Sequence, residues 1–139
     1  MKKTSGMEVI EKKSNGRGRK CINFKWVFEI KRDGTFRARL VACGYSQIPG
    51  VDFQESHSPV INDVVIRILV VCQIMWRLNV GLLDVEVAFL NGDLDEIIYI
   101  EVPDGVEHEP DEIVILLKSM YGLVQAARQF FLKFSKILK

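Results

Sequence analysis

Leu82-Leu83-Asp84-Val85-Glu86-Val87-Ala88-Phe89-Leu90-Asn91-Gly92 is the stretch from which we expect the fold to be organised. The apolar run over residues 80–83 ends in the carboxylate of Asp84, and a turn follows at Asn91-Gly92-Asp93 after a brief helical piece. A short apolar run bounded by turn residues is typical of a buried strand. The stretch therefore predicts a strand over residues 80–84 that presents one acid at the rim of a sheet, where it can bind a metal ion.

Two more strands and a helix are predicted downstream. Residues 97–102 form an apolar run that ends at Pro103, and residues 113–118 form another after an acidic loop. Beyond them, apolar residues recur at steps of three and four, which is typical of an amphipathic helix. Its apolar face consists of Leu123, Ala127, Phe130, Phe131, Phe134 and Leu138. Its other face is predicted to carry Gln125, Arg128, Lys133 and Lys136.

Upstream, residues 21–43 have the clearest local pattern. Apolar and polar residues alternate in two runs, and Asp33-Gly34 between them predicts a β-hairpin with a two-residue turn. One face is apolar, and the other carries four cations near the turn, namely Lys31, Arg32, Arg37 and Arg39. Guanidinium groups bind phosphate oxygens in a bidentate manner, so this face could clamp a triphosphate. Equally, the cations could simply keep an exposed face soluble.

Residues 44–62 contain Gly44, Pro49-Gly50 and Pro59 and predict a loop. Asn62 or Asp63 can then cap a helix that extends to about Asn79. Apolar residues occupy nearly every side of this helix, which predicts that it is buried. Its Val, Ile and Cys residues would also suit a strand.

Composition indicates a globular chain of one domain or part of one, because 48% of the 139 residues are hydrophobic and 27% are charged. The charges are segregated: residues 1–43 carry a net +8, residues 44–112 a net −12 and residues 113–139 a net +5. This pattern suits a protein that holds a polyanion at its flanks and divalent cations at its centre, or a solvated surface whose charges happen to cluster. Residues 1–20 are predicted to be a flexible basic lead-in, and residues 21–139 the domain itself.

Three widely spaced cysteines without a C-x-x-C pair argue against a disulfide framework or a zinc site. No apolar segment follows Lys2-Lys3 as a secretory signal would require, and the longest apolar run, residues 64–76, is too short to span a bilayer. We therefore expect an intracellular protein, cytoplasmic or nuclear and not secreted, that does not contact membranes.

The order of the segments over residues 24–136 resembles the N-terminal half of the reverse transcriptase domain of copia/Ty1-type retrotransposons. Several short motifs carry this resemblance in one order and at similar separations. They are residues 25–34 (KWVFEIKRDG), 38–42 (ARLVA), 44–47 (GYSQ), 53–59, 83–85 (LDV), 88–94 (AFLNGDL), 121–123 (YGL) and 125–128 (QAAR). Each motif alone is weak, and together they are specific.

The resemblance implies an RNA-directed DNA polymerase, which transfers deoxynucleotides with two Mg²⁺ ions and therefore needs several carboxylate oxygens. Its partners would be an RNA or DNA template-primer and deoxynucleoside triphosphates. Asp84 matches the first metal-binding aspartate, and the carbonyl of Val85 would help to hold the metal on the nucleotide side. Phe89 matches the aromatic residue that lies under the sugar and crowds a 2′ hydroxyl.

The resemblance also implies that Gln125 contacts the incoming nucleotide or its template partner. Lys31, Arg37 and Arg39 match the basic fingers residues that neutralise the triphosphate. Each site assignment has an alternative. Asp84 could be a helix-cap or turn aspartate, Phe89 a core aromatic residue, and Gln125 a polar residue on an exposed helix face.

The sequence departs from the family pattern at Glu86, Cys43, Ala126-Ala127 and Phe130. It also contains no pair of adjacent aspartates, which the family has as its second catalytic motif. We therefore expect a truncated reverse transcriptase domain that is inactive alone. Its fold would be α+β, a partial polymerase right hand with a fingers β-hairpin and an incomplete palm of antiparallel sheet and packed helices.

Other outcomes remain open at this point. The missing C-terminal half of the polymerase, or other proteins encoded by the element, could act as partners. The chain could instead be a non-catalytic remnant that binds nucleic acid, or a small α+β protein that binds none. An incomplete sheet would leave an unpaired edge and exposed apolar surface, so we also expect self-association.

Overall fold

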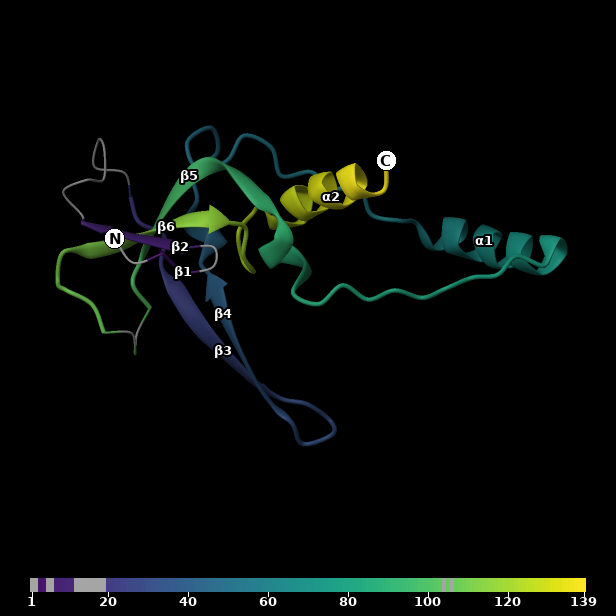
Figure 1. The fold of residues 1–139 in the computed structure, drawn as a ribbon, viewed down its shortest axis with the longest axis horizontal. Helices are drawn as coiled ribbons and strands as arrows, with labels where there is room; N and C mark the ends of the chain where they lie inside the picture. Colours follow the sequence, from purple (N-terminus) through teal and green to yellow (C-terminus); the bar gives the residue numbers. More distant parts are fainter. Residues whose placement is uncertain (1–2, 5–6, 12–19, 104, 106) are drawn as a thin grey trace.

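Two antiparallel sheets and two α-helices make up the part of the chain described by the computed structural model, residues 3–4, 7–11, 20–103, 105 and 107–139 (Figure 1). One sheet has four strands in the order β1 (Lys3–Thr4), β2 (Met7–Glu11), β6 (Glu112–Lys118) and β5 (Asp93–Glu101). The other pairs β3 (Phe24–Ile30) with β4 (Phe36–Ala42). The helices are α1 (Asp63–Trp76) and α2 (Ala126–Ile137). The predicted α+β class is confirmed.

The β5–β6 pair is the centre of the four-stranded sheet. Ile98 pairs with Leu116 and Ile100 with Val114, and all four side chains are buried. Both strands were predicted, although β5 begins at Asp93, before the apolar run. On the other side of β6, Met7 of β2 pairs with Leu116. The prediction of a flexible lead-in is therefore wrong for Met7–Glu11, because β6 offers this segment a free edge for backbone hydrogen bonds; residues 1–2, 5–6 and 12–19 lie outside the described part.

The β3–β4 hairpin is confirmed, but its turn has one residue more than predicted. The amide of Lys31 donates to the carbonyl of Thr35 (2.9 Å), so the turn comprises Arg32, Asp33 and Gly34. The amide of Gly34 donates back to the carbonyl of Lys31 (2.9 Å), and Gly34 has φ +81°. A three-residue turn of this kind ends in a left-handed residue, which glycine adopts without steric cost.

The hydrophobic core lies where the base of the hairpin meets the β5–β6 pair and the start of α2. Its buried residues are Ile22, Ala42, Cys43, Ile98, Ile100, Val114, Leu116, Met120, Leu123 and Ala126. The hairpin enters this core only at its base, since Phe28 is 75% exposed and Phe36 83%. The predicted apolar face of the hairpin therefore exists, but its outer half is uncovered.

Helix α2 is confirmed close to its predicted position, and its inner face contacts η3, a short 3₁₀ helix over Ala88–Asn91. Polar contacts attach its outer surface to other segments. Lys133 forms an ion pair with Asp93 of β5 (2.7 Å), and Arg128 forms one with Glu55. The loop that contains Glu55 therefore lies against α2.

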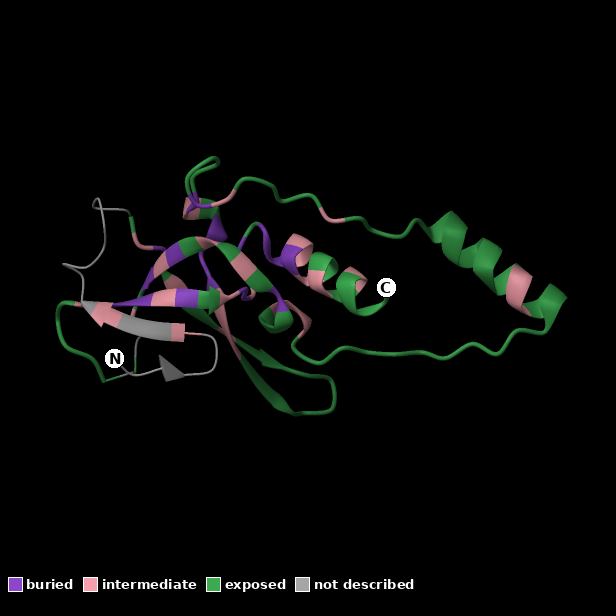
Figure 2. Cartoon of the chain, turned by 45° about the horizontal axis from the view of Figure 1, so that its top comes forward, coloured by how far each residue is buried: buried purple, intermediate pink, exposed green. Residues whose placement is uncertain are grey.

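Helix α1 begins where predicted, and the side chain of its N-cap Asn62 accepts a hydrogen bond from the amide of Val64 (2.9 Å). The prediction that it is buried is wrong. No residue of α1 is buried, and Figure 2 shows it at the end of two long connections, away from the rest of the described chain. Its apolar pattern indicates only that the helix suits an apolar environment, and none of the described elements covers it. Neither described helix is long and apolar enough to cross a membrane.

The predicted strand over residues 80–84 is also wrong. Residues 78–85 have no regular structure, and Leu82 and Leu83 are 99% and 91% exposed. A strand requires a neighbouring strand for its backbone hydrogen bonds. The described sheets lie on the far side of η3, and this segment instead connects α1 to η3 (Figure 1).

Candidate functional site

The outer part of the β3–β4 hairpin gathers cations on one face. Strand register places Glu29 opposite Arg37 and Val27 opposite Arg39, on the face away from Trp26 and Phe28. Arg39 is engaged, because its Nη1 atom lies 2.9 Å from Oε2 of Glu29. Among the described residues, Lys31, Arg32 and Arg37 are exposed and form no ion pair. These three side chains are therefore available to an anion.

Asp33 organises the turn between these cations. Its Oδ1 atom accepts a hydrogen bond from the amide of Thr35 (2.9 Å). This bond stabilises the ionised carboxylate and holds the pKa of Asp33 below its ordinary value. The turn is thereby fixed from within, and the cations on either side of it are held on a short loop.

Asp84, the expected metal ligand, is exposed in the irregular segment that precedes η3, and Val85 beside it is 40% exposed. Within the described residues, no group of three or more His, Cys, Asp or Glu side chains is arranged to hold a metal ion. The described residues thus do not fit a site for two Mg²⁺ ions. Asp84 is accessible, but among the described residues it does not belong to a group of three or more such ligands.

Phe89 of η3 lies against the core and not in the open. Its ring makes edge-to-face contacts with Tyr121 (centroids 5.1 Å apart) and with Phe130 of α2 (6.5 Å). Such contacts fix the position of a ring in addition to burying it. The arrangement favours the core alternative for Phe89.

Gln125 was expected to contact a nucleotide or its template partner, with a polar residue on an exposed helix face as the alternative, and the structure buries it completely. Its Oε1 atom accepts a hydrogen bond from Nε2 of Gln47 (3.0 Å), and its Nε2 atom donates to the carbonyl of Asp52 (3.1 Å). Gln47, itself 8% exposed, also accepts from the amide of Val124 (2.8 Å) through Oε1. Both ends of Gln125 are therefore used inside the protein. The alternative of an exposed polar residue is wrong because Gln125 precedes α2, where the helical pattern does not yet apply.

Two glycines, Gly44 and Gly122, bring the segment that contains Gln47 and the segment that leads to Gln125 into backbone contact. A Cβ on Gly44 would lie 2.0 Å from the carbonyl oxygen of Gly122, and one on Gly122 would lie 2.1 Å from the carbonyl oxygen of Ala42. The amide of Ala42 donates to the carbonyl of Tyr121 (2.8 Å). Two motifs almost 80 residues apart in sequence, GYSQ at 44–47 and YGL at 121–123, thus form one junction.

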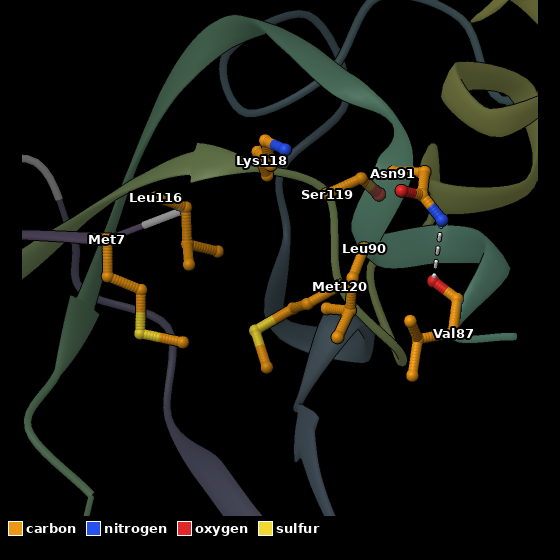
Figure 3. Close-up of a pocket in the computed structure, with 8 residues that line it drawn as sticks. All are labelled: Met7, Val87, Leu90, Asn91, Leu116, Lys118, Ser119 and Met120. Carbon is orange, nitrogen blue, oxygen red and sulfur yellow. Dashed lines mark hydrogen bonds between the residues drawn. The ribbon is translucent and has the colours of Figure 1, made fainter. Parts of the chain in front are cut away.

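A cavity of about 270 Å³ lies between η3 and the end of β6 (Figure 3). It is lined mainly by apolar side chains, namely those of Met7, Val87, Leu90, Leu116 and Met120, together with Asn91, Lys118 and Ser119. The hydroxyl of Ser119 is buried there and has no hydrogen-bond partner among the residues that the structure describes. Val87 has φ +46°, which is strained for a β-branched residue. None of the expected site residues lines this cavity.

Taken together, the structure brings the hairpin cations to one face but gives Asp84, Phe89 and Gln125 three different environments. Gln47 and Asp52 were not predicted as partners of Gln125. The only signal for them was that GYSQ occurs among the matched motifs, and a motif match does not reveal which residue contacts which.

Comparison with known proteins gives a consistent result. Residues 7–139 match the family described as reverse transcriptase (RNA-dependent DNA polymerase). The chain is 42% identical over 130 residues to the retrovirus-related Pol polyprotein from transposon TNT 1-94 of Nicotiana tabacum, which covers 88% of this chain and 10% of that protein. It is 38% identical over 119 residues to the Pol polyprotein from transposon RE2 of Arabidopsis thaliana, covering 81% of this chain and 8% of that one.

A yeast relative is more distant. The transposon Ty1-BL Gag-Pol polyprotein of Saccharomyces cerevisiae is 29% identical over 113 residues, which covers 81% of this chain and 6% of that protein. The chain thus spans a tenth or less of the length of these curated relatives. No solved structure matches the chain significantly.

Proposed function

This chain belongs to the reverse transcriptase (RNA-dependent DNA polymerase) family of copia-type transposons, and we propose that it forms the phosphate-binding fingers part of an RNA-directed DNA polymerase. The observation that carries this proposal is the family match over residues 7–139. The hairpin supports it, because three exposed cations at its outer end can neutralise the phosphates of a nucleotide or a primer-template. Template-primer and deoxynucleoside triphosphates would be the ligands.

We propose Asp84 and the carbonyl of Val85 as metal-side groups, with Phe89 beside the sugar, only within a larger polymerase. Asp84 would be one ligand among those that such a polymerase needs to hold magnesium, which would supply charge stabilisation to the phosphates. One exposed carboxylate does not hold two hard cations. The residues of this chain would contribute a single carboxylate, and the other ligands would have to come from other sequence.

The 139 residues by themselves should not synthesise DNA, because they contain no adjacent aspartate pair and no described metal-ligand group. A primer-extension assay with Mg²⁺ should give no templated product above background, and Asp84→Asn should give the same result. Extension that depends on the template and is lost in Asp84→Asn would overturn this part of the proposal.

Binding tests the fingers assignment separately from chemistry. Fluorescence anisotropy with a labelled primer-template should show binding that weakens steeply with salt, because phosphate contacts release counterions. The pair Lys31→Ala and Arg37→Ala should weaken binding about tenfold at low salt and reduce the salt dependence, since two phosphate contacts are removed. Lys136→Ala, in the last turn of α2, is the matched control and should change affinity little.

A second candidate function is nucleic-acid binding without chemistry. The same exposed cations favour it, and it differs in one respect. A remnant should bind single-stranded and duplex nucleic acid alike and be indifferent to deoxynucleoside triphosphates, whereas fingers should bind the triphosphates through Lys31 and Arg37.

A further inference from the structure

We propose that Gln47 and Gln125 are positioning residues that fix the β3–β4 hairpin to α2 and the four-stranded sheet in one orientation. The orienting role itself does not depend on the proposed function. Its consequence does, because the orientation of the hairpin would determine where the phosphate-binding cations lie. It gives Gln125 a role that does not require contact with a nucleotide.

The hairpin depends on its base for its orientation. Its outer half is exposed, since Phe28 is 75% and Phe36 83% exposed. Packing therefore does not fix the outer half of the hairpin. At the base, each strand has its own attachment. On the β3 side, the amide of Ile22 donates to Tyr99 of β5 (2.9 Å), and the amide of Glu101 donates to Ile22 (3.2 Å).

On the β4 side, the attachment consists of the Ala42–Tyr121 backbone bond and the segment that follows it. This segment turns at Gly44 against Gly122 and ends at Gln47, whose side chain reaches across to Val124 and Gln125. Gln125 in turn donates to Asp52, farther along the same loop. The two amide side chains therefore tie two points of the loop after β4, Gln47 and Asp52, to the residues that lead into α2.

Because these two glutamines are buried, their hydrogen bonds favour one orientation of the hairpin over others. Gln125 is fully buried and Gln47 nearly so, and an unpaired amide in such a place costs the full desolvation of the group. Moving the hairpin relative to α2 would break the Gln47–Gln125 bond or separate Gln125 from Asp52, leaving buried polar groups without partners. Buried polar networks that are fully paired favour one arrangement over others in this way.

Gln47→Glu tests the tie with little change of shape. When neutral, the new carboxyl group can still accept from Val124 and donate to Oε1 of Gln125; when ionised, it has no proton to donate and faces that oxygen as an anion. Burial disfavours the charged form, so the carboxyl group should stay neutral in mild acid and ionise at higher pH. If this hydrogen bond orients the hairpin, the orientation in Gln47→Glu should depend on pH. If residue 47 only fills space, the orientation should not change with pH.

The measurement is a distance distribution by pulsed electron paramagnetic resonance on the full chain. Spin labels at Phe36→Cys on the hairpin and Ile97→Cys on β5, both exposed positions, report the hairpin angle, with the three native cysteines replaced by alanine. The parent should give one narrow distribution at pH 5 and at pH 8. Gln47→Glu should be narrow at pH 5 and at least about twice as wide at pH 8, because the hydrogen bond from the neutral carboxyl group to Gln125 is replaced by two buried acceptors that face each other without a proton.

Gln54→Glu is the matched control, since Gln54 is an exposed glutamine of the same loop. Among the described residues, its side chain bonds only to the nearby Gly50 carbonyl (3.2 Å), and its amide donates to Glu96 (3.2 Å). It should be narrow at both pH values. Equal widths for Gln47→Glu at the two pH values, or a wide distribution in the parent, would overturn the proposal.

If Gln47→Glu does not fold at pH 8, Gln47→Asn replaces it, because a side chain shorter by one methylene group cannot reach Val124 and Gln125 together. That variant should give the wide distribution at neutral pH, and a narrow one would overturn the proposal. Primer-template binding is measured in parallel. A parent that binds no nucleic acid would contradict the proposed function, while the distances would still decide whether the two glutamines orient the hairpin.

Discussion

At the scale of single residues, Gly34 and Gly122 share a left-handed backbone but not their surroundings. Gly34 has φ +81° with open space at the Cβ position, whereas Gly122 has φ +93° and backbone oxygen 2.1 Å from that position. Glycine is favoured at position 34 only because the backbone is left-handed there. At position 122 it is required also because two chain segments touch there.

The two glycines therefore predict different costs for the same substitution. Gly34→Ala should lower the free energy of unfolding by about 1 kcal/mol, which is the usual penalty of a left-handed residue with a Cβ. Gly122→Ala should cost more than about 3 kcal/mol or prevent folding, because overpacking against backbone is added to that penalty. Urea denaturation followed by circular dichroism measures both, and equal costs would contradict the close contact with Ala42.

Asp33 gives a prediction about pH. Because the pKa of its carboxyl group is lowered by the bond from the Thr35 amide, the turn gains stability above the ordinary pKa of an aspartate and loses it as pH falls through the lowered pKa. A titration of the Asp33 side chain by NMR should have its midpoint below about 3.9, the value for an unstructured aspartate. A midpoint at or above that value would show that the turn does not form as described.

At the scale of elements, η3 is held against α2 by aromatic packing. Phe89 contacts Tyr121 and Phe130, and the turn that leads into η3 is closed by Asn91, whose Nδ2 atom donates to the carbonyls of Glu86 (3.4 Å) and Val87 (3.5 Å). These contacts fix the point where the segment that carries Asp84 joins the core. The position of Asp84 itself is set only by the irregular residues before that point.

Removing the ring of Phe89 should consequently lower the stability of the fold, whatever its effect on ligand binding. Phe89→Ala should lower the free energy of unfolding by about 3 kcal/mol, the usual cost of deleting a packed aromatic side chain. Phe28→Ala on the exposed half of the hairpin is the control and should cost less than about 0.5 kcal/mol, as surface changes do. Similar small costs for both would mean that Phe89 is free to act only at a ligand.

At the scale of the whole molecule, the chain exposes more surface than its mass requires. Its accessible area is 10843 Å², whereas a compact monomer of this mass should expose about 7,400 Å². Much of the excess lies on α1 and the two connections to it, where Val64, Ile68, Leu69, Ile74 and Met75 are all more than half exposed. Apolar surface of this extent is typical of a site that another surface covers.

We therefore expect the isolated chain to self-associate. Light scattering after size-exclusion chromatography should give a mass above 15.9 kDa that grows with concentration. Ile68→Lys with Leu69→Lys should shift the population toward the monomer, because charges on α1 oppose its burial. Phe36→Lys, at an exposed apolar position on the hairpin, is the comparison; if it has the larger effect, association runs through the hairpin and not through α1.

The local pattern of the sequence was sufficient for the hairpin, for β5 and β6, for the start of α1 and for α2. Each of these depends on alternation, helical spacing or a capping residue, which are properties of neighbouring residues. The same pattern led to a buried strand at residues 80–84 and a buried α1, and both predictions were wrong. An apolar run indicates that a segment prefers apolar surroundings, but its burial depends on whether another element packs against it.

By itself, then, the sequence determined the family, the α+β class and the cationic face of the hairpin, because these follow from motifs and from short-range periodicity. Only the tertiary structure decided that Gln125 is bonded to Gln47 and Asp52, that Gly44 lies against Gly122, that β2 adds to the edge of β6, and that Asp84 is exposed on an irregular segment. The physical reason is that hydrogen bonds and close contacts between residues far apart in the chain depend on where whole elements lie, and no local pattern encodes that position.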